Sequence, residues 1–414
     1  MKIKKIFLII SHLFLCFIVS CNQTSEGILV IDMDKPAGFI DLRISELLDD
    51  ISIVPLETSD NLLIRPSSPV AVTEQYILVF EEEKLLQFDR KGKFIKVLAV
   101  RGNGPNEYNT ISKRLIDEKR ELMYFTDYKD RKSISCIDLK TGKISMYAIQ
   151  LTHFSQLGID SDGYIYGFLP AFDASLFPDE FEKELKPENS TKLAFRFQPQ
   201  NEELIFYRGT RSLLGSYSTP AYGNSLMFTR NDHIFFIIPN YSDTLFKIED
   251  TRIIPKYIFK LKNQSIHPRK GGHALRVHMA GQEGILFSKV EIHASFREDG
   301  SVSSAGLNRL SYLFLDRKNE LKTVNSIIID PLGFTIGCFD LHYKEKNNII
   351  INRVPSISGT YAYFKIFPNN EFLTLIKQEL ISNQLSSDQH KMLKNIIDNV
   401  DEDSNFLLII GKVK

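Results

Sequence analysis

The segment 101–108, Arg-Gly-Asn-Gly-Pro-Asn-Glu-Tyr, carries a mixture of side chains suited to binding a ligand. Glycine lets a backbone approach a ligand closely, and the neighbouring side chains supply charge, amide and phenol groups. The candidate ligand-binding residues are Arg101, Asn103, Glu107 and Tyr108. The segment joins two successive repeats, which predicts a place at the face of a central channel. The alternative is structural, with Gly102 and Gly104 at positive φ and Glu107 bonded to neighbouring backbone.

A second candidate is the basic, histidine-rich stretch 267–278. Arg269 and His273 are candidates for gripping an anionic sugar or a phosphate, because guanidinium and ammonium groups bind such anions well. His273 and His278 are five residues apart, which is a poor spacing for chelation from one helix face. The alternative interpretation is a solvated loop between repeats.

Metal-ligand patterns are weak in this chain. Asp160-Ser-Asp-Gly163 offers two carboxylates but lacks the remaining ligands and the terminal Glu of a calcium loop, so it predicts a β-turn. The spacing of the cysteines fits no zinc site. We therefore predict no cofactor, and a divalent metal such as calcium enters only under the enzyme alternative given below.

The N-terminus has the pattern of an export signal. Residues 1–5 are basic, residues 6–19 are almost wholly apolar, and the run ends at Ser20-Cys21. Such a run is short for a membrane span. Ile18-Val-Ser-Cys21 resembles a bacterial lipobox, which implies that residues 1–20 are removed and that Cys21 is lipidated. Cys16 is a poorer candidate because the large Leu15 precedes it, and an ordinary signal peptide with Cys21 as a free thiol is the alternative.

Composition narrows the range of partners. The chain of 414 residues has 51 basic and 51 acidic side chains, so it gives no sign of a nucleic-acid partner, which would need a clustered basic excess. We expect a monomer.

Cys136 and Cys338 could pair in an oxidising compartment, and two buried thiols are the alternative.

The candidate residues lie within a repeated β pattern. From Ile51 to about Lys377, short runs of β-branched and aromatic residues alternate with Gly, Asn and Asp turns. The second strand of the first unit starts at Tyr76 and that of the second unit at Leu122, an offset of 46 residues. Four strands with a period of about 40 to 50 residues are typical of propeller blades. Four diverged units follow. The third includes 156–159, 164–168, 192–197 and 203–207, and the fourth includes 225–228, 233–238, 244–248 and 255–259. The fifth includes 293–296, 310–315 and 327–329, and the sixth includes 337–340, 348–351 and 361–366.

The two ends of this pattern predict ring closure. Asp50–Leu56 and Phe406–Ile410 are lone apolar strands that could complete one sheet and so cover its edges. Between the sixth unit and the last strand lies one helix, from Ser386 to about Asn399, with Ser386 and Gln389 as a capping box. The predicted fold class is therefore all-β. We expect a tether and lead-in over 21–49, then a six-bladed β-propeller of four-stranded antiparallel blades over 50–414, with a C-terminal helix on its rim and a strand closing the ring.

Several segments together carry a family resemblance. They are Leu56-Glu-Thr58, Leu86-Gln-Phe-Asp-Arg-Lys-Gly-Lys-Phe-Ile95, Gly102-Asn-Gly-Pro-Asn-Glu-Tyr108, Tyr241-Ser-Asp-Thr-Leu-Phe-Lys-Ile248 and the terminal strand that ends in Lys. In this order they resemble the six-bladed β-propeller lipoproteins of Bacteroidota, which are related in fold to NHL propellers. The resemblance covers residues 50–414 and implies a propeller on a lipid anchor in the outer membrane, with its periplasmic or surface face undetermined. It implies no settled activity.

Two functions remain open at this stage. The first is a non-enzymatic envelope lipoprotein that binds a protein or glycan ligand, within glycan uptake or sensing. The second is a metal-dependent propeller hydrolase or lyase with inward-facing carboxylates at the channel mouth. The residues lining the channel would distinguish them, and the sequence does not place those residues.

Overall fold

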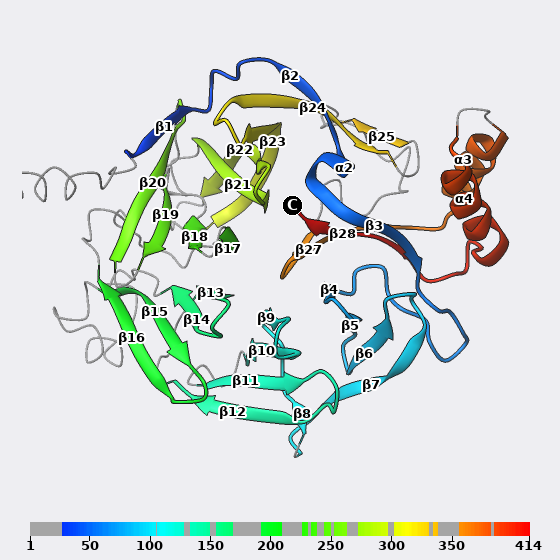
Figure 1. The fold of residues 1–414 in the computed structure, drawn as a ribbon, viewed down its shortest axis with the longest axis horizontal. Helices are drawn as coiled ribbons and strands as arrows, with labels where there is room; N and C mark the ends of the chain where they lie inside the picture. The colour runs from blue at the N-terminus through cyan, green and yellow to red at the C-terminus, as the bar shows by residue number, and fades with distance from the viewer. Residues whose placement is uncertain are drawn as a thin grey trace, which may run out of the picture.

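The computed structural model describes residues 27–104, 106–127, 133–149, 155–168, 192–208, 226–230, 233–237, 244–249, 252–262, 272–296, 302–330, 334–337, 356–381 and 385–414. These residues form a ring of six antiparallel blades around a central axis (Figure 1). The predicted fold class, an all-β six-bladed propeller, is confirmed.

The first three blades follow chain order from the inner strand to the outer strand. The first blade consists of β4 (Val70–Val72), β5 (Tyr76–Phe80), β6 (Lys84–Asp89) and β7 (Phe94–Arg101). The second consists of β9 (Lys113–Asp117), β10 (Leu122–Thr126), β11 (Ser133–Asp138) and β12 (Ile144–Ala148). The third consists of β13 (Ser155–Ile159), β14 (Ile165–Phe168), β15 (Lys192–Gln198) and β16 (Glu203–Arg208). A two-residue strand, β8 (Glu107–Tyr108), adds to β7 in parallel. The sequence predicted all three sheets.

The last three blades are longer and less regular. The fourth blade consists of β17 (Leu226–Arg230), β18 (His233–Ile237), β19 (Thr244–Glu249) and β20 (Arg252–Lys260). The fifth consists of β21 (Gly272–Ala280), β22 (Gly284–Phe296), β23 (Val302–Asp316) and β24 (Leu321–Ile329). The sixth consists of β26 (Ser356–Ser358), β27 (Tyr361–Ile366), β28 (Leu407–Val413) and β3 (Leu48–Pro55). The fourth sheet matches its prediction. A parallel bridge between Arg208 and Arg252 connects the third and fourth blades.

The fifth blade corrects the sequence interpretation in two places. Its first strand is β21, which occupies part of the stretch 267–278 that the alternative interpretation assigned to a solvated loop. In addition, Gly337 was assigned to the sixth unit, but it ends β25 (Phe334–Gly337), which pairs with β24 of the fifth blade. Residues 338–355 of the predicted sixth unit lie outside the described residues.

Each junction between neighbouring blades contains its own apolar cluster. Alternate residues of a strand point to opposite faces of its sheet. In β5, Ile77 and Val79 therefore pack toward the sixth blade, whereas Leu78 and Phe80 pack toward the second. The remaining junctions have equivalent clusters. Each sheet therefore buries both of its faces against its two neighbours, which a single sheet could not do alone.

A recurring Asp turn positions each of the first two blades against the blade that precedes it in the ring. Asp89 Oδ1 accepts hydrogen bonds from the N–H groups of Lys91 (2.8 Å) and Lys93 (2.9 Å), and Asp138 makes the equivalent turn one blade later. Gly92 has φ +84°, and a Cβ there would lie 2.0 Å from the carbonyl oxygen of Pro55. Glycine is thus required both for the backbone angle and for the close approach to the preceding blade.

The predicted closure by both chain ends is confirmed. β3 and β28 pair antiparallel, from Leu407 opposite Pro55 to Val413 opposite Leu48. Buried Asn405 ties the segment after β3 to this sheet. Its Nδ2 donates to the carbonyls of Glu57 (2.7 Å) and Leu62 (2.8 Å), and its Oδ1 accepts from the N–H of Ile64 (2.8 Å).

The segment that holds β1 and β2 runs along the outside of the ring, and we call it the N-terminal belt (residues 27–43). β1 (Leu29–Asp32) pairs in parallel with β20, and β2 (Phe39–Arg43) pairs in parallel with β24. A helical turn, α2 (Ile44–Leu47), then leads into β3. The described part of the expected tether and lead-in thus adds strands to the outer edges of two blades (Figure 1).

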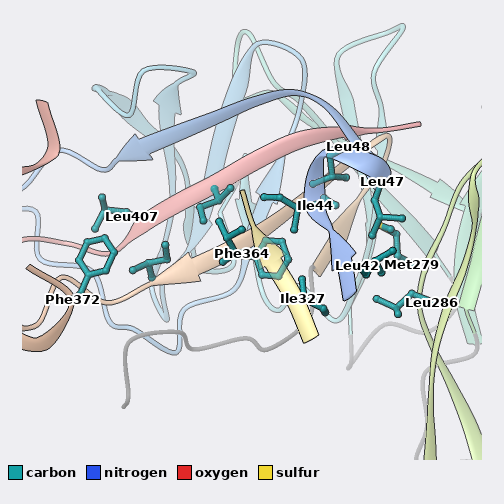
Figure 2. Close-up of a cluster of buried hydrophobic side chains, with 14 of the residues drawn as sticks. Leu42, Ile44, Leu47, Leu48, Met279, Leu286, Ile327, Phe364, Phe372 and Leu407 are labelled. Carbon is teal, nitrogen blue, oxygen red and sulfur yellow. The ribbon is translucent and has the colours of Figure 1, made fainter. Parts of the chain in front are cut away.

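Two helices lie beside the sixth blade, outside the ring (Figure 1). The predicted helix is confirmed as α4 (Ser387–Asn399), with Ser386 as N-cap and the capping box formed with Gln389. The sequence missed α3 (Asn370–Ile381), because its short apolar run falls inside the β pattern that was extended to Lys377. Both helices pack on the cluster between the fifth and sixth blades, where Phe372 meets Leu407 (Figure 2). Among the described residues, no helix has the length and apolar character needed to cross a bilayer.

Candidate functional site

The predicted binding loop folds back on itself. The N–H of Gly104 donates to Glu107 Oε2 (2.7 Å), and the N–H of Gly102 donates to the carbonyl of Tyr108 (2.9 Å). A Cβ at Gly102 would lie 1.9 Å from Glu107 Oε2, so a larger side chain there would have to displace this carboxylate. The carboxylate of Glu107 therefore organises the loop, as the structural alternative predicted.

Two details of that expectation are wrong. The residue with positive φ in the described part of the loop is Asn106 (φ 63°), and the two glycines do not adopt it. The loop was also expected at the channel face. However, β8 pairs with β7, the outer strand of its blade, and Asn106 Oδ1 accepts from the N–H of Ile144 on outer strand β12 (Figure 1). This part of the loop therefore joins the outer edges of two blades.

The side chains proposed to bind a ligand differ in accessibility. Arg101 and Asn103 are exposed, and Arg101 lies 3.8 Å from Glu83. Tyr108 is buried, and this burial, reinforced by Glu83, raises the pKa of its phenol to about 12. Of the four, Arg101 and Asn103 present their side chains to solvent, and a binding role for the loop stays a prediction.

The histidine-rich stretch lies on a different blade. Arg269 is outside the described residues, whereas His273 is on β21, where its Nδ1–H donates to the carbonyl of Lys262 (2.9 Å). Asp34 of the belt lies next to it and pairs with Lys289. Burial opposes ionisation of Asp34, but its bonds with Lys289 and Lys262 and the nearby His273 give a net lowering of its pKa. His273 is thus part of the contact between the belt and the fifth blade. The structure does not bring it close to the loop 101–108.

The turn predicted at Asp160 is confirmed. Asp160 Oδ1 accepts from the N–H groups of Asp162 (3.0 Å) and Tyr164 (2.9 Å), and Oδ2 accepts from the Tyr166 hydroxyl (2.8 Å). Within the described part of the chain, no group of three or more His, Cys, Asp or Glu side chains is arranged to hold a metal ion. Cys136 is a buried free thiol whose pKa is raised to about 12 by burial, and Cys338 lies outside the described residues.

A polar group that the sequence analysis did not identify lies at one end of the inner strands. We call it the junction cluster: Glu74, Arg90, Glu118 and Tyr361. Glu118 follows inner strand β9, Glu74 lies in the turn after inner strand β4, Arg90 follows β6, and Tyr361 begins β27. Blades six, one and two therefore contribute one or two residues each, and β4, β9 and β27 lie near the centre of the ring (Figure 1).

The contacts of the cluster hold its charged groups at fixed positions. Glu118 Oε2 accepts from the N–H of Glu74 (2.9 Å). The guanidinium of Arg90 donates to the carbonyl of Thr73 (2.6 Å) and stacks on the Tyr361 ring, with Cζ 4.6 Å from the ring centroid. Such a stack combines the positive charge of arginine with the negative face of an aromatic ring.

Glu118 is the chemically unusual member of the cluster. Burial raises its pKa to about 7, and the adjacent Glu74 contributes, while the backbone hydrogen bond and Arg90 oppose the shift. Its Oε1 atom is inaccessible and has no hydrogen-bond partner among the described residues. A carboxyl with this pKa can donate or accept a proton near neutral pH, and its buried, unpaired oxygen disfavours the charged form.

Buried cationic groups lie at the other end of the same strands. Lys365 on β27 is buried, donates to the carbonyls of Ser68 and Pro66, and lies over the Phe406 ring at 4.6 Å. Burial lowers its pKa to about 8, and the charge of Arg114 on β9 adds to this effect. Arg114 itself stacks on Phe80 at 4.4 Å. Because the partners of Lys365 are carbonyls of the chain, we interpret it as structural.

The sequence contained a weak signal for the junction cluster. Glu74 and Glu118 both stand just after the first strand of a blade, so superposing the two units would have brought them to similar positions. Nothing local connects either residue with Tyr361, which is more than 200 residues further along the chain.

The sheets, their order and the closure define this molecule as a six-bladed β-propeller. The chain belongs to the family described as Domain of unknown function (DUF4934), whose model matches residues 28–412. A comparison with curated proteins found no match.

Two solved structures illustrate the likeness. A Bacteroides fragilis protein inferred to be exported has 12% sequence identity and a TM-score of 0.53, covering 93% of this chain and 99% of its own. A structural genomics protein of unknown function from Bacteroides thetaiotaomicron has 7% identity and a TM-score of 0.41, covering 87% of this chain and 76% of its own. The first shows a shared fold, and the second carries no further argument.

Proposed function

We propose that this protein is a lipid-anchored cell-envelope propeller that binds a protein or glycan ligand at the end of its ring where the junction cluster lies. The observation that carries the binding role is this cluster, because three consecutive blades place an acid, a guanidinium and a phenol there. Side chains on turns held by a rigid scaffold are well suited to binding. The exposed carboxylate of Glu74 can accept hydrogen bonds from a ligand with hydroxyl or amide donors, as glycans and peptides have.

Binding can be tested with a matched pair of variants. Purified protein is titrated calorimetrically with envelope oligosaccharides, and candidate protein partners are tested in the same way. Glu118→Gln removes the charge while keeping the shape, and we expect it to weaken binding by roughly tenfold, the equivalent of one good hydrogen bond to a charged group. Glu203→Gln, at an exposed carboxylate on β16, is the control and should bind normally. Equal affinities for both variants would refute the assignment of the site.

The envelope location is supported by the lipobox at Cys21 and by the export signal before it. The Bacteroides fragilis protein of similar fold is inferred to be exported, which agrees with this location. The test is to fractionate cells that make the wild type or Cys21→Ser and to measure the mass of the N-terminal peptide. We expect an acylated Cys21 and a membrane-bound wild type, with the variant released. An unmodified Cys21 would contradict the anchor.

A second candidate function, hydrolysis or elimination on a glycan, is supported by one observation. The pKa of Glu118, raised to about 7, is suited to a general acid or base near neutral pH. Incubating wild type and Glu118→Gln with envelope glycans, with and without calcium, tests this function. Product release by the wild type alone would support it, equal release by both proteins would exclude Glu118 as the catalytic group, and absent release would leave ligand binding as the function.

A further inference from the structure

One face of the belt strand β1 carries apolar side chains that are open to solvent. β1 and β20 run parallel with Val30 opposite Ile258, so the even-numbered residues of β1 and of its paired residues 257–260 lie on one face. The odd-numbered Ile31 and Phe259 are buried in the cluster between the fourth and fifth blades. On the even face, Val30 is 48% exposed, and Ile28, which directly precedes β1, is 50% exposed.

The belt exposes a further large apolar side chain, and exposed lysines lie at the end of β20. Phe39, at the start of β2, is 71% exposed, which is high for a large aromatic side chain. Lys260 and Lys262 are exposed at the end of β20. Apolar side chains flanked by lysines are typical of surfaces that contact lipid headgroups and the first part of the acyl chains.

The distance to the lipobox cysteine identifies what could cover this face. Ile28 follows Cys21 by seven residues, and a fully extended chain of that length spans at most about 25 Å. If Cys21 is lipidated, the outer edge of the fourth blade is therefore held close to the bilayer. An apolar face at that distance can reach the lipid without any change in the ring.

From these observations we infer that the even face of β1 and β20, with Phe39 of β2, is a membrane-docking surface that seats the ring edge-on against the bilayer carrying the anchor. This inference rests on the lipid anchor of the proposed function and adds the orientation of the ring. The axis of the propeller then lies roughly along the membrane plane, so both ends of the ring stay open to ligands.

The absence of tryptophan from the chain allows a direct test. Full-length lipidated protein carrying Val30→Trp is reconstituted into phospholipid vesicles, and its fluorescence is compared with that of Val97→Trp. Val97 is a matched control because it is also a valine on an outer strand, is 40% exposed, and lies on β7 across the ring (Figure 1). The mass of the N-terminal peptide is measured on the same samples.

We expect the emission of Val30→Trp to shift to shorter wavelength in vesicles and to be quenched by brominated acyl chains, while Val97→Trp changes little. Equal responses of the two variants with an acylated Cys21 would overturn the docking surface and leave the anchor intact. An unmodified Cys21 would overturn both. A shift of Val30→Trp that occurs without vesicles and depends on protein concentration would assign the face to a second copy of the chain, which also overturns the proposal.

Discussion

At the scale of single residues, Glu118 should make the stability of the protein depend on pH. Its pKa in the folded state is about 7, against an ordinary value of 4.5. Between these two pH values the folded state therefore holds a proton that the unfolded state has released. The stability contributed by this group is complete below about pH 4.5 and is lost as the pH rises through about 7.

The test compares wild type with Glu118→Gln by urea unfolding from about pH 4 to about pH 8. We expect the wild type to lose stability relative to the variant between pH 4.5 and 7, with the difference constant on either side of that window. Parallel pH profiles for the two proteins would show that burial does not perturb Glu118.

Asn405 is the residue whose loss should affect the closure most directly. Asn405→Ala would leave the buried N–H of Ile64 and the carbonyls of Glu57 and Leu62 without their partner. An unsatisfied buried group costs about 1–3 kcal/mol, so we expect a loss of about 3 kcal/mol or more in the free energy of unfolding, measured in urea. Asn399→Ala, on the exposed side of α4, is the control and should change stability by less than about 1 kcal/mol. Similar losses for both would contradict the role of Asn405.

At the scale of elements, strand β28 contributes to two of the apolar clusters between blades at once. Leu407 and Ile409 pack toward the fifth blade, whereas Leu408 and Ile410 pack toward the first. Leu408→Ala should therefore cost about 2–5 kcal/mol through the cavity that it leaves, as judged by the urea midpoint. Lys412→Ala, at an exposed position of the same strand, should be close to neutral. If Leu408→Ala were neutral too, β28 would not be packed as described.

The elements that the sequence predicted are those with strong local signals. The first four sheets follow from alternating apolar residues separated by Asp and Gly turns, and α4 follows from its capping box. The missed elements, α3 and β21, have short or mixed apolar patterns for which the surroundings decide between helix, strand and loop. The junction cluster was missed for a different reason, because its members meet only when Glu118 and Tyr361 are brought together by closure of the ring.

At the scale of the whole molecule, the belt and the closed ring should differ in local stability. Within the described part of the chain, β1 and β2 each pair along one edge, whereas β5 lies between two strands and contributes to two of the apolar clusters between blades. Hydrogen exchange should therefore be faster for the amides of β1 and β2 than for those of β5, since local opening of the belt leaves the closure of the ring intact. Equal protection would indicate that the belt and the ring unfold as one unit.

The pairing of β3 with β28 also sets the order of events during biosynthesis. Pro55 leaves the ribosome about 350 residues before its partner Leu407 does, so β3 must wait with one edge unpaired while the rest of the chain is made. Contacts between such distant positions form slowly. A chain truncated before residue 407 would hold most of its blades and still be unable to close, and quality control could recognise it by that open edge.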